Sequence, residues 1–135
     1  MFRPFITVLA ALACFYLTPA AYADDVPTMS ADKLMTELTM PHPPLILDVR
    51  SAEEFAEGHL PGAVNMAYTD LEKQLDQFDQ SQEIVVYCVA GIRAAKALKI
   101  LQSHRFSHLW HLEGDYAGWV NSGRRIEGAA PSTPH

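Results

Sequence analysis

The sequence lacks a hydrophobic run long enough to cross a membrane. Its N-terminal apolar stretch, 5–17, has thirteen residues, whereas a transmembrane helix needs about 20. Arg3 precedes this stretch, and a small-x-small motif, Ala-Tyr-Ala at 21–23, follows it just before Asp24. This arrangement is typical of a cleaved secretory signal peptide. We therefore expect removal of residues 1–23, no membrane attachment afterwards, and a periplasmic location of the Gram-negative type.

Cysteine is also scarce, with only Cys14 and Cys88 in the chain. Cys14 lies in the expected signal peptide. The preceding Leu-Ala resembles a lipoprotein site, but cleavage there would cut the apolar region and leave a very short signal. Cys88 is then the single thiol of the mature chain, which excludes an intramolecular disulfide and the resolving cysteine of a thiol peroxidase or disulfide exchanger. It is either a buried, inert thiol or a reactive one.

Positive charge is the third deficit, with 10 Lys and Arg against 16 Asp and Glu. The expected signal peptide contains one basic residue and no acidic one, so 9 minus 16 leaves a mature net charge of −7. This charge argues against nucleic acid and anionic membranes as partners.

Removing 23 of 135 residues leaves 112, enough for one domain and too few for two. We expect that domain at 24–128 and a disordered tail at 129–135; the oligomeric state stays open.

Apolar strand patterns and helix patterns alternate along the chain. We expect strands at 45–49, 63–65, 84–87 and 107–112, and helices after Ser30, after Ser51, from Thr69 to Phe78, and at 93–104. Ser51 with Glu54 and Thr69 with Glu72 both have the spacing of a capping box. The run 84–87 shows no polar alternation, which indicates a strand buried on both faces, as in a parallel sheet. The sequence therefore predicts an α/β fold.

Cys88 directly follows this best strand and precedes a predicted helix. In open α/β sheets, ligands bind beyond the carboxyl ends of the strands, and the N-terminus of the next helix offers free N–H groups to an anion. A helix N-terminus and a nearby arginine, here Arg93, also stabilise a thiolate. Gly91 suits a loop whose amides turn inward around one centre. Position alone leaves an inert core cysteine as an equal alternative.

Three segments decide between these alternatives, because together they resemble a single-domain rhodanese. The segments are LILDVRSAEEFAEGHLPGAVN at 45–65, IVVYCVAGIRAAKAL at 84–98 and HLEGDYAGW at 111–119. They are similar in order and spacing to the D-V-R, E-F and G-H-I-P-G-A pieces of that family, its C-x-x-G-x-R loop, and its final motif. The resemblance implies about five mainly parallel strands flanked by helices on both faces, and a sulfurtransferase whose cysteine carries a persulfide.

Carried over by residue, the resemblance makes Cys88 the nucleophile. It makes Val89, Ala90, Gly91, Ile92 and Arg93 the loop whose amides surround the outer sulfur, with Arg93 closing that loop. Asp48 and Arg50 match the D-V-R piece, where we expect a structural ion pair at the end of a strand. His59 matches the histidine of the G-H-I-P-G-A piece, which is expected to pack and to form hydrogen bonds rather than to catalyse.

The chain also departs from the family pattern. Asp115 stands where the family usually has a second glycine, and His-Arg-Phe at 104–106 replaces its usual Gly-Phe. We expect both changes to alter turns and not the chemistry. His108 and His111 lie three apart on a predicted strand, so their side chains should point to opposite faces and, together with His104, not hold a metal. No metal or organic cofactor is expected.

The expected reaction takes a sulfane sulfur from thiosulfate or a persulfide onto Cys88 and passes it to cyanide, sulfite or a thiol. Only Arg93 adds positive charge to the loop, so a persulfide should be a better donor than the thiosulfate dianion. Cysteine phosphatases and arsenate reductases are an alternative, but they place five residues between Cys and Arg, and 89–92 are four. A thiol-based interaction module is another, although such modules are expected to have lost the cysteine.

Overall fold

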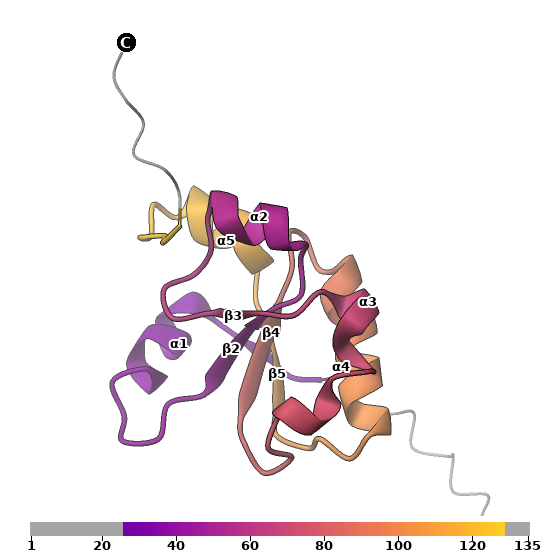
Figure 1. Cartoon of the computed structure of the whole chain (residues 1–135). Coiled ribbons are helices and arrows are strands. Elements are labelled where there is room, and N and C mark those ends of the chain that lie inside the picture. Colours follow the sequence, from indigo (N-terminus) through magenta and orange to yellow (C-terminus); the bar gives the residue numbers. More distant parts are fainter. Residues whose placement is uncertain (1–25, 129–135) are drawn as a thin grey trace, which may run out of the picture.

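The computed structural model describes residues 26–128 and contains one sheet of five parallel strands (Figure 1). The strands are β1 (Thr28–Met29), β2 (Leu45–Asp48), β3 (Val64–Asn65), β4 (Ile84–Tyr87) and β5 (Leu109–Leu112), in the spatial order β1-β5-β4-β2-β3. The predicted signal peptide and C-terminal tail lie outside the described residues. The fold confirms the predicted α/β class, and every strand pair in the sheet is parallel. No helix of the described part is long and apolar enough to span a membrane.

The helices are α1 (Ala31–Glu37), α2 (Ala52–Glu57), α3 (Tyr68–Leu71), α4 (Ile92–Ser103) and α5 (Asp115–Asn121), with a 3-10 turn at Leu75–Gln77. Two predicted caps are confirmed. Ser30 Oγ accepts the Lys33 N–H at 3.1 Å before α1. Ser51 and Glu54 form a capping box that starts α2, with both reciprocal hydrogen bonds present.

The predicted capping box at Thr69 and the continuous helix to Phe78 are wrong. After β3, the chain keeps hydrogen bonding to the end of β2 and to Val49 beyond it, and the Tyr68 N–H donates to Val49 O at 3.2 Å. Helix α3 therefore begins one residue earlier, after Ala67, and no side chain caps it. It ends at Leu71, and the 3-10 turn follows separately.

Hydrophobic clusters cover both faces of the sheet. Ile84 and Val86 of β4 pack with Leu71 of α3 and with the buried face of α4. Val85 and Tyr87, which point the other way, pack with residues of α1 and α5. Every residue of β4 is fully buried, as its unbroken apolar run predicts. Side chains therefore pack against both faces of the central strand β4, up to its last residue, Tyr87.

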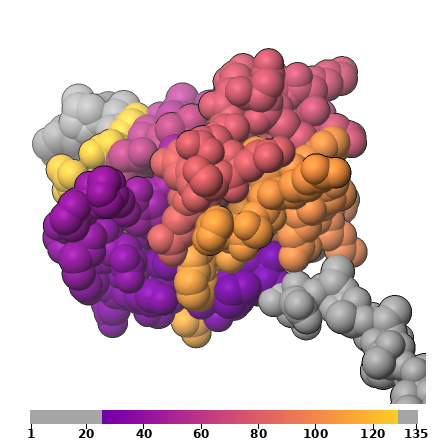
Figure 2. Space-filling model, turned by 90° about the horizontal axis from the view of Figure 1, so that it is seen from below, coloured from indigo at the N-terminus to yellow at the C-terminus, as the bar shows by residue number. Residues whose placement is uncertain are grey.

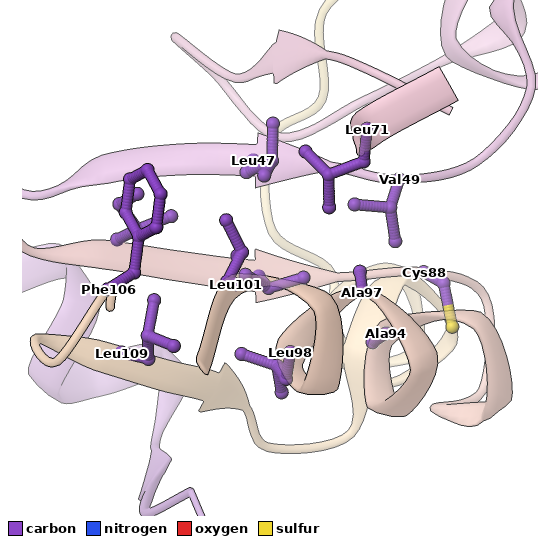
Figure 3. Close-up of a cluster of buried hydrophobic side chains, with 12 residues drawn as sticks. Leu47, Val49, Leu71, Cys88, Ala94, Ala97, Leu98, Leu101, Phe106 and Leu109 are labelled. Carbon is purple, nitrogen blue, oxygen red and sulfur yellow. The ribbon is translucent and has the colours of Figure 1, made fainter. Parts of the chain in front are cut away.

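Cys88 lies at the edge of the first cluster, beside Ala94 and Ala97 of α4 (Figure 3). The opposite end of the molecule carries the segments that precede β2, β4 and β5 (Figure 2). A groove there is lined by residues of all three segments, among them Pro41, Asp79 and His108. The thiol thus belongs to the carboxyl edge of the sheet, where parallel α/β folds bind ligands.

Candidate active site

Both polar backbone groups of Cys88, its N–H and its carbonyl, form hydrogen bonds. Its N–H donates to Asp115 Oδ1 at 3.0 Å, and its carbonyl accepts the Tyr116 N–H at 2.9 Å. The residue is 2% exposed. Its Sγ accepts the Gly91 N–H at 3.0 Å. A backbone amide directed at the sulfur stabilises negative charge there, as a thiolate or an outer persulfide sulfur requires.

The predicted loop 88–93 turns around this sulfur and leads into α4. Gly91 has a φ of +107°, which an L side chain rarely adopts, and it caps α4. Ile92 and Arg93 are the first two helical residues, so their N–H groups have no acceptor within the helix. The side chains of Val89 and Ile92 are exposed, Ile92 to 74%. The loop therefore directs the Gly91 amide at the sulfur and exposes apolar side chains to the solvent.

Arg93 forms a two-pronged ion pair with Glu54 of α2. Nη1 donates to Oε1 at 2.6 Å and Nη2 to Oε2 at 2.9 Å. The hydrogen bond from Arg93 is the main reason why the pKa of Glu54 falls to about 2, and bonds from Ser51 contribute. The same hydrogen bond raises the pKa of Arg93. Arg93 thus links the loop to α2, and its charge is balanced by a carboxylate for which the sequence pattern predicted only a capping role.

Asp48 and Arg50 form the expected pair, and both are buried. Arg50 Nη2 lies 2.7 Å from Asp48 Oδ2 and donates also to the Gly58 carbonyl at 2.6 Å. Its guanidinium stacks 4.0 Å from the centre of the Tyr116 ring. Burial is the largest single influence and acts to lower the pKa of Arg50, but the hydrogen bond with Asp48 and the nearby charge of Asp48 together raise the pKa overall. The pair ties the end of β2 to the C-terminus of α2 and to α5.

The side chain of Asp115 contacts the loop. We expected the replacement of the family's second glycine by Asp115 to alter only a turn. Its φ of +53° is tolerated because aspartate, like asparagine, enters the left-handed region more easily than most residues. His111 Nε2 lies 3.0 and 3.1 Å from its two carboxylate oxygens. Oδ2 would lie 3.3 Å from a Cβ built on Gly91. Asp115 and His111 therefore contact the active loop, although neither was among the predicted site residues.

His59 and His104 form contacts outside the active loop. His59 donates from Nδ1 to the Phe55 carbonyl at 2.8 Å and stacks on the Phe55 ring at 3.6 Å, which agrees with the packing role expected of it. His104 faces Glu72 at 3.3 Å on the surface. Within residues 26–128, no group of three or more His, Cys, Asp or Glu side chains is arranged to hold a metal ion.

The sheet order, the loop after the central strand and the cysteine at its start define a rhodanese-like domain. The family model of that description matches residues 30–122, and the chain belongs to this family. A human single-domain sulfurtransferase has 27% identity and a TM-score of 0.66, with 72% of this chain and 97% of that one covered. A rhodanese-like domain from Anabaena has 29% identity and a TM-score of 0.70, with 82% and 89% covered.

Curated relatives carry several names. The chain is 35% identical to thiosulfate sulfurtransferase 16 of Arabidopsis thaliana, over 57% of this chain and 74% of that protein. It is 28% identical to a thiosulfate:glutathione sulfurtransferase of Saccharomyces cerevisiae, over 58% and 66%. It is also 31% identical to tRNA uridine(34) hydroxylases of Buchnera aphidicola, over 60% of this chain. The chain spans only 27% of the length of those hydroxylases.

Proposed function

We propose that this protein is a sulfurtransferase that carries sulfane sulfur on Cys88. One observation carries the proposal: Cys88 Sγ accepts the Gly91 N–H at 3.0 Å inside a C-x-x-G-x-R loop that follows the central strand. Relatives named thiosulfate sulfurtransferase and thiosulfate:glutathione sulfurtransferase support the same chemistry. The loop needs no metal or organic cofactor for it.

In the first half-reaction, the Cys88 thiolate attacks the outer sulfur of the donor. With thiosulfate, an S–S bond forms to Cys88, the bond between the two donor sulfurs breaks, and sulfite leaves with the electron pair of that bond. With an organic persulfide, the corresponding thiolate leaves. The product, Cys88–S–S⁻, places its negative outer sulfur among the loop amides, where oriented N–H dipoles stabilise it.

In the second half-reaction, a thiophilic acceptor attacks the outer sulfur and releases the Cys88 thiolate. Cyanide, sulfite and small thiols all have the required nucleophilic atom. We propose that the donors are thiosulfate or persulfides, and that the protein acts in the periplasm after cleavage of its signal peptide. Its partners are therefore small sulfur compounds.

The test supplies thiosulfate and cyanide and measures thiocyanate, with aryl phosphate hydrolysis in parallel. The proposal predicts turnover with wild-type protein, no turnover with Cys88→Ser, and no phosphatase activity in either. Only four residues separate Cys88 from Arg93, so the loop is too small for a phosphate with its oxygens. Aryl phosphate hydrolysis without sulfur transfer would replace the proposal with the phosphatase alternative.

A further inference from the structure

Arg93, the last residue of the loop, and Arg50, at the end of β2, add little net positive charge to the site. Arg93 is paired with Glu54 through two hydrogen bonds, and Arg50 is paired with Asp48 in the core. Each cation is therefore matched by a carboxylate at contact distance. Asp115 is a further acidic group that contacts the loop, at Cys88 and Gly91.

Two residues hold the Asp115 carboxylate in place. Oδ1 accepts the Cys88 N–H, and His111 approaches both oxygens. Because a carboxylate only accepts, His111 donates its Nε2–H to Asp115. Asp115 is also the first residue of α5, where a helix N-terminus favours negative charge. Asp115 is only 5% exposed, and these contacts give both of its carboxylate oxygens hydrogen-bond partners.

Gly91 lies close to both this carboxylate and the reactive sulfur. Its N–H donates to Cys88 Sγ at 3.0 Å, and a Cβ built on Gly91 would lie 3.3 Å from Asp115 Oδ2. A negative donor that reaches Cys88 therefore comes close to a fixed negative charge. The repulsion grows with the charge of the donor, and the low polarity of the site screens it less than water does.

We propose that Asp115, oriented by His111, is a specificity-determining residue that disfavours doubly charged sulfur donors and so favours singly charged ones. This inference rests on the proposed function and names its donor class: organic persulfides and thiosulfonates, each with one negative charge at the reacting end. A glycine at this position, as is usual in the family that the chain resembles, would lack that charge.

The test compares thiosulfate with methanethiosulfonate, which has a similar shape and one charge fewer. Asp115→Asn keeps an oxygen that accepts the Cys88 N–H and tolerates the positive φ, but removes the charge. At pH 8.5 and low salt, we expect this variant to lower the KM for thiosulfate about fivefold relative to the KM for methanethiosulfonate. The kcat values should stay within about twofold, because the loop keeps its hydrogen bond.

Two further variants make the result decisive. Asp115→Gly suits the backbone conformation and also removes the charge, so it should shift the KM ratio in the same direction even if the asparagine variant folds poorly. Glu113→Gln removes an equal charge from an exposed position two residues away and should leave the ratio unchanged. If Asp115 had a purely structural role, its replacement would change the KM values for both donors by the same factor. An unchanged ratio in both Asp115 variants, with sulfur transfer intact, overturns the inference, whereas no transfer by wild-type protein overturns the proposed function itself.

Discussion

Replacing Glu54 by glutamine should weaken the link between the active loop and α2 while keeping the capping box. Glutamine can still accept the Ser51 N–H, so the variant removes the charge that pairs with Arg93. The pKa of Glu54 falls from 4.5 to about 2, which sets an upper limit of about 3.4 kcal/mol for the contribution to stability. The Glu54 side chain is 33% exposed, so solvent screening reduces the expected loss to about 1 kcal/mol.

The sign of the pH dependence follows from the lowered pKa. The ionised group stabilises the folded protein above pH 4.5, and this stabilisation is lost as the pH falls towards 2. Urea unfolding of wild-type protein and Glu54→Gln should therefore differ at pH 7 and converge near pH 2. Glu53→Gln, an exposed change in the same first turn, should show no such convergence. Equal differences at both pH values would refute the assignment of this energy to the ion pair.

Three other perturbations test separate parts of the structure. Asp48→Asn leaves the Arg50 charge buried without its partner and should lower the free energy of unfolding by about 3 kcal/mol in urea titrations; a loss below about 1 kcal/mol would contradict the buried pair. Gly91→Ala forces a side chain into a positive φ and against Asp115, so the melting temperature should fall by the equivalent of about 1–2 kcal/mol and sulfur transfer should slow. N-terminal sequencing of exported protein should begin at Asp24, and a retained Met1 or a lipid on Cys14 would exclude the predicted processing.

The elements that sequence patterns predicted correctly are those whose cause is local. The buried strand 84–87 is an unbroken apolar run, and the start of α2 is a capping box of neighbouring residues. The C-x-x-G-x-R loop is also contiguous, so its placement between β4 and α4 follows from the elements on either side. The role assigned to each loop residue stays a prediction until sulfur transfer is measured.

The features that sequence patterns missed depend on contacts between distant parts of the chain. Strand β1 has two residues and exists because it pairs with β5. Arg93 meets Glu54 across 39 positions, and the Cys88 N–H meets Asp115 across 27. No local periodicity signals such pairings. The one available sign of a role for Asp115 was its place in a position that normally holds glycine, and that sign suggested an altered turn rather than a contact with the loop.

The central claim is that Cys88 receives a sulfur atom. Intact-protein mass spectrometry after incubation with thiosulfate, methanethiosulfonate or glutathione persulfide tests it directly. The account predicts a gain of one sulfur atom in wild-type protein, its loss on adding cyanide, and no gain in Cys88→Ser. An unchanged mass with every donor, in protein whose fold and free thiol are verified, would contradict it.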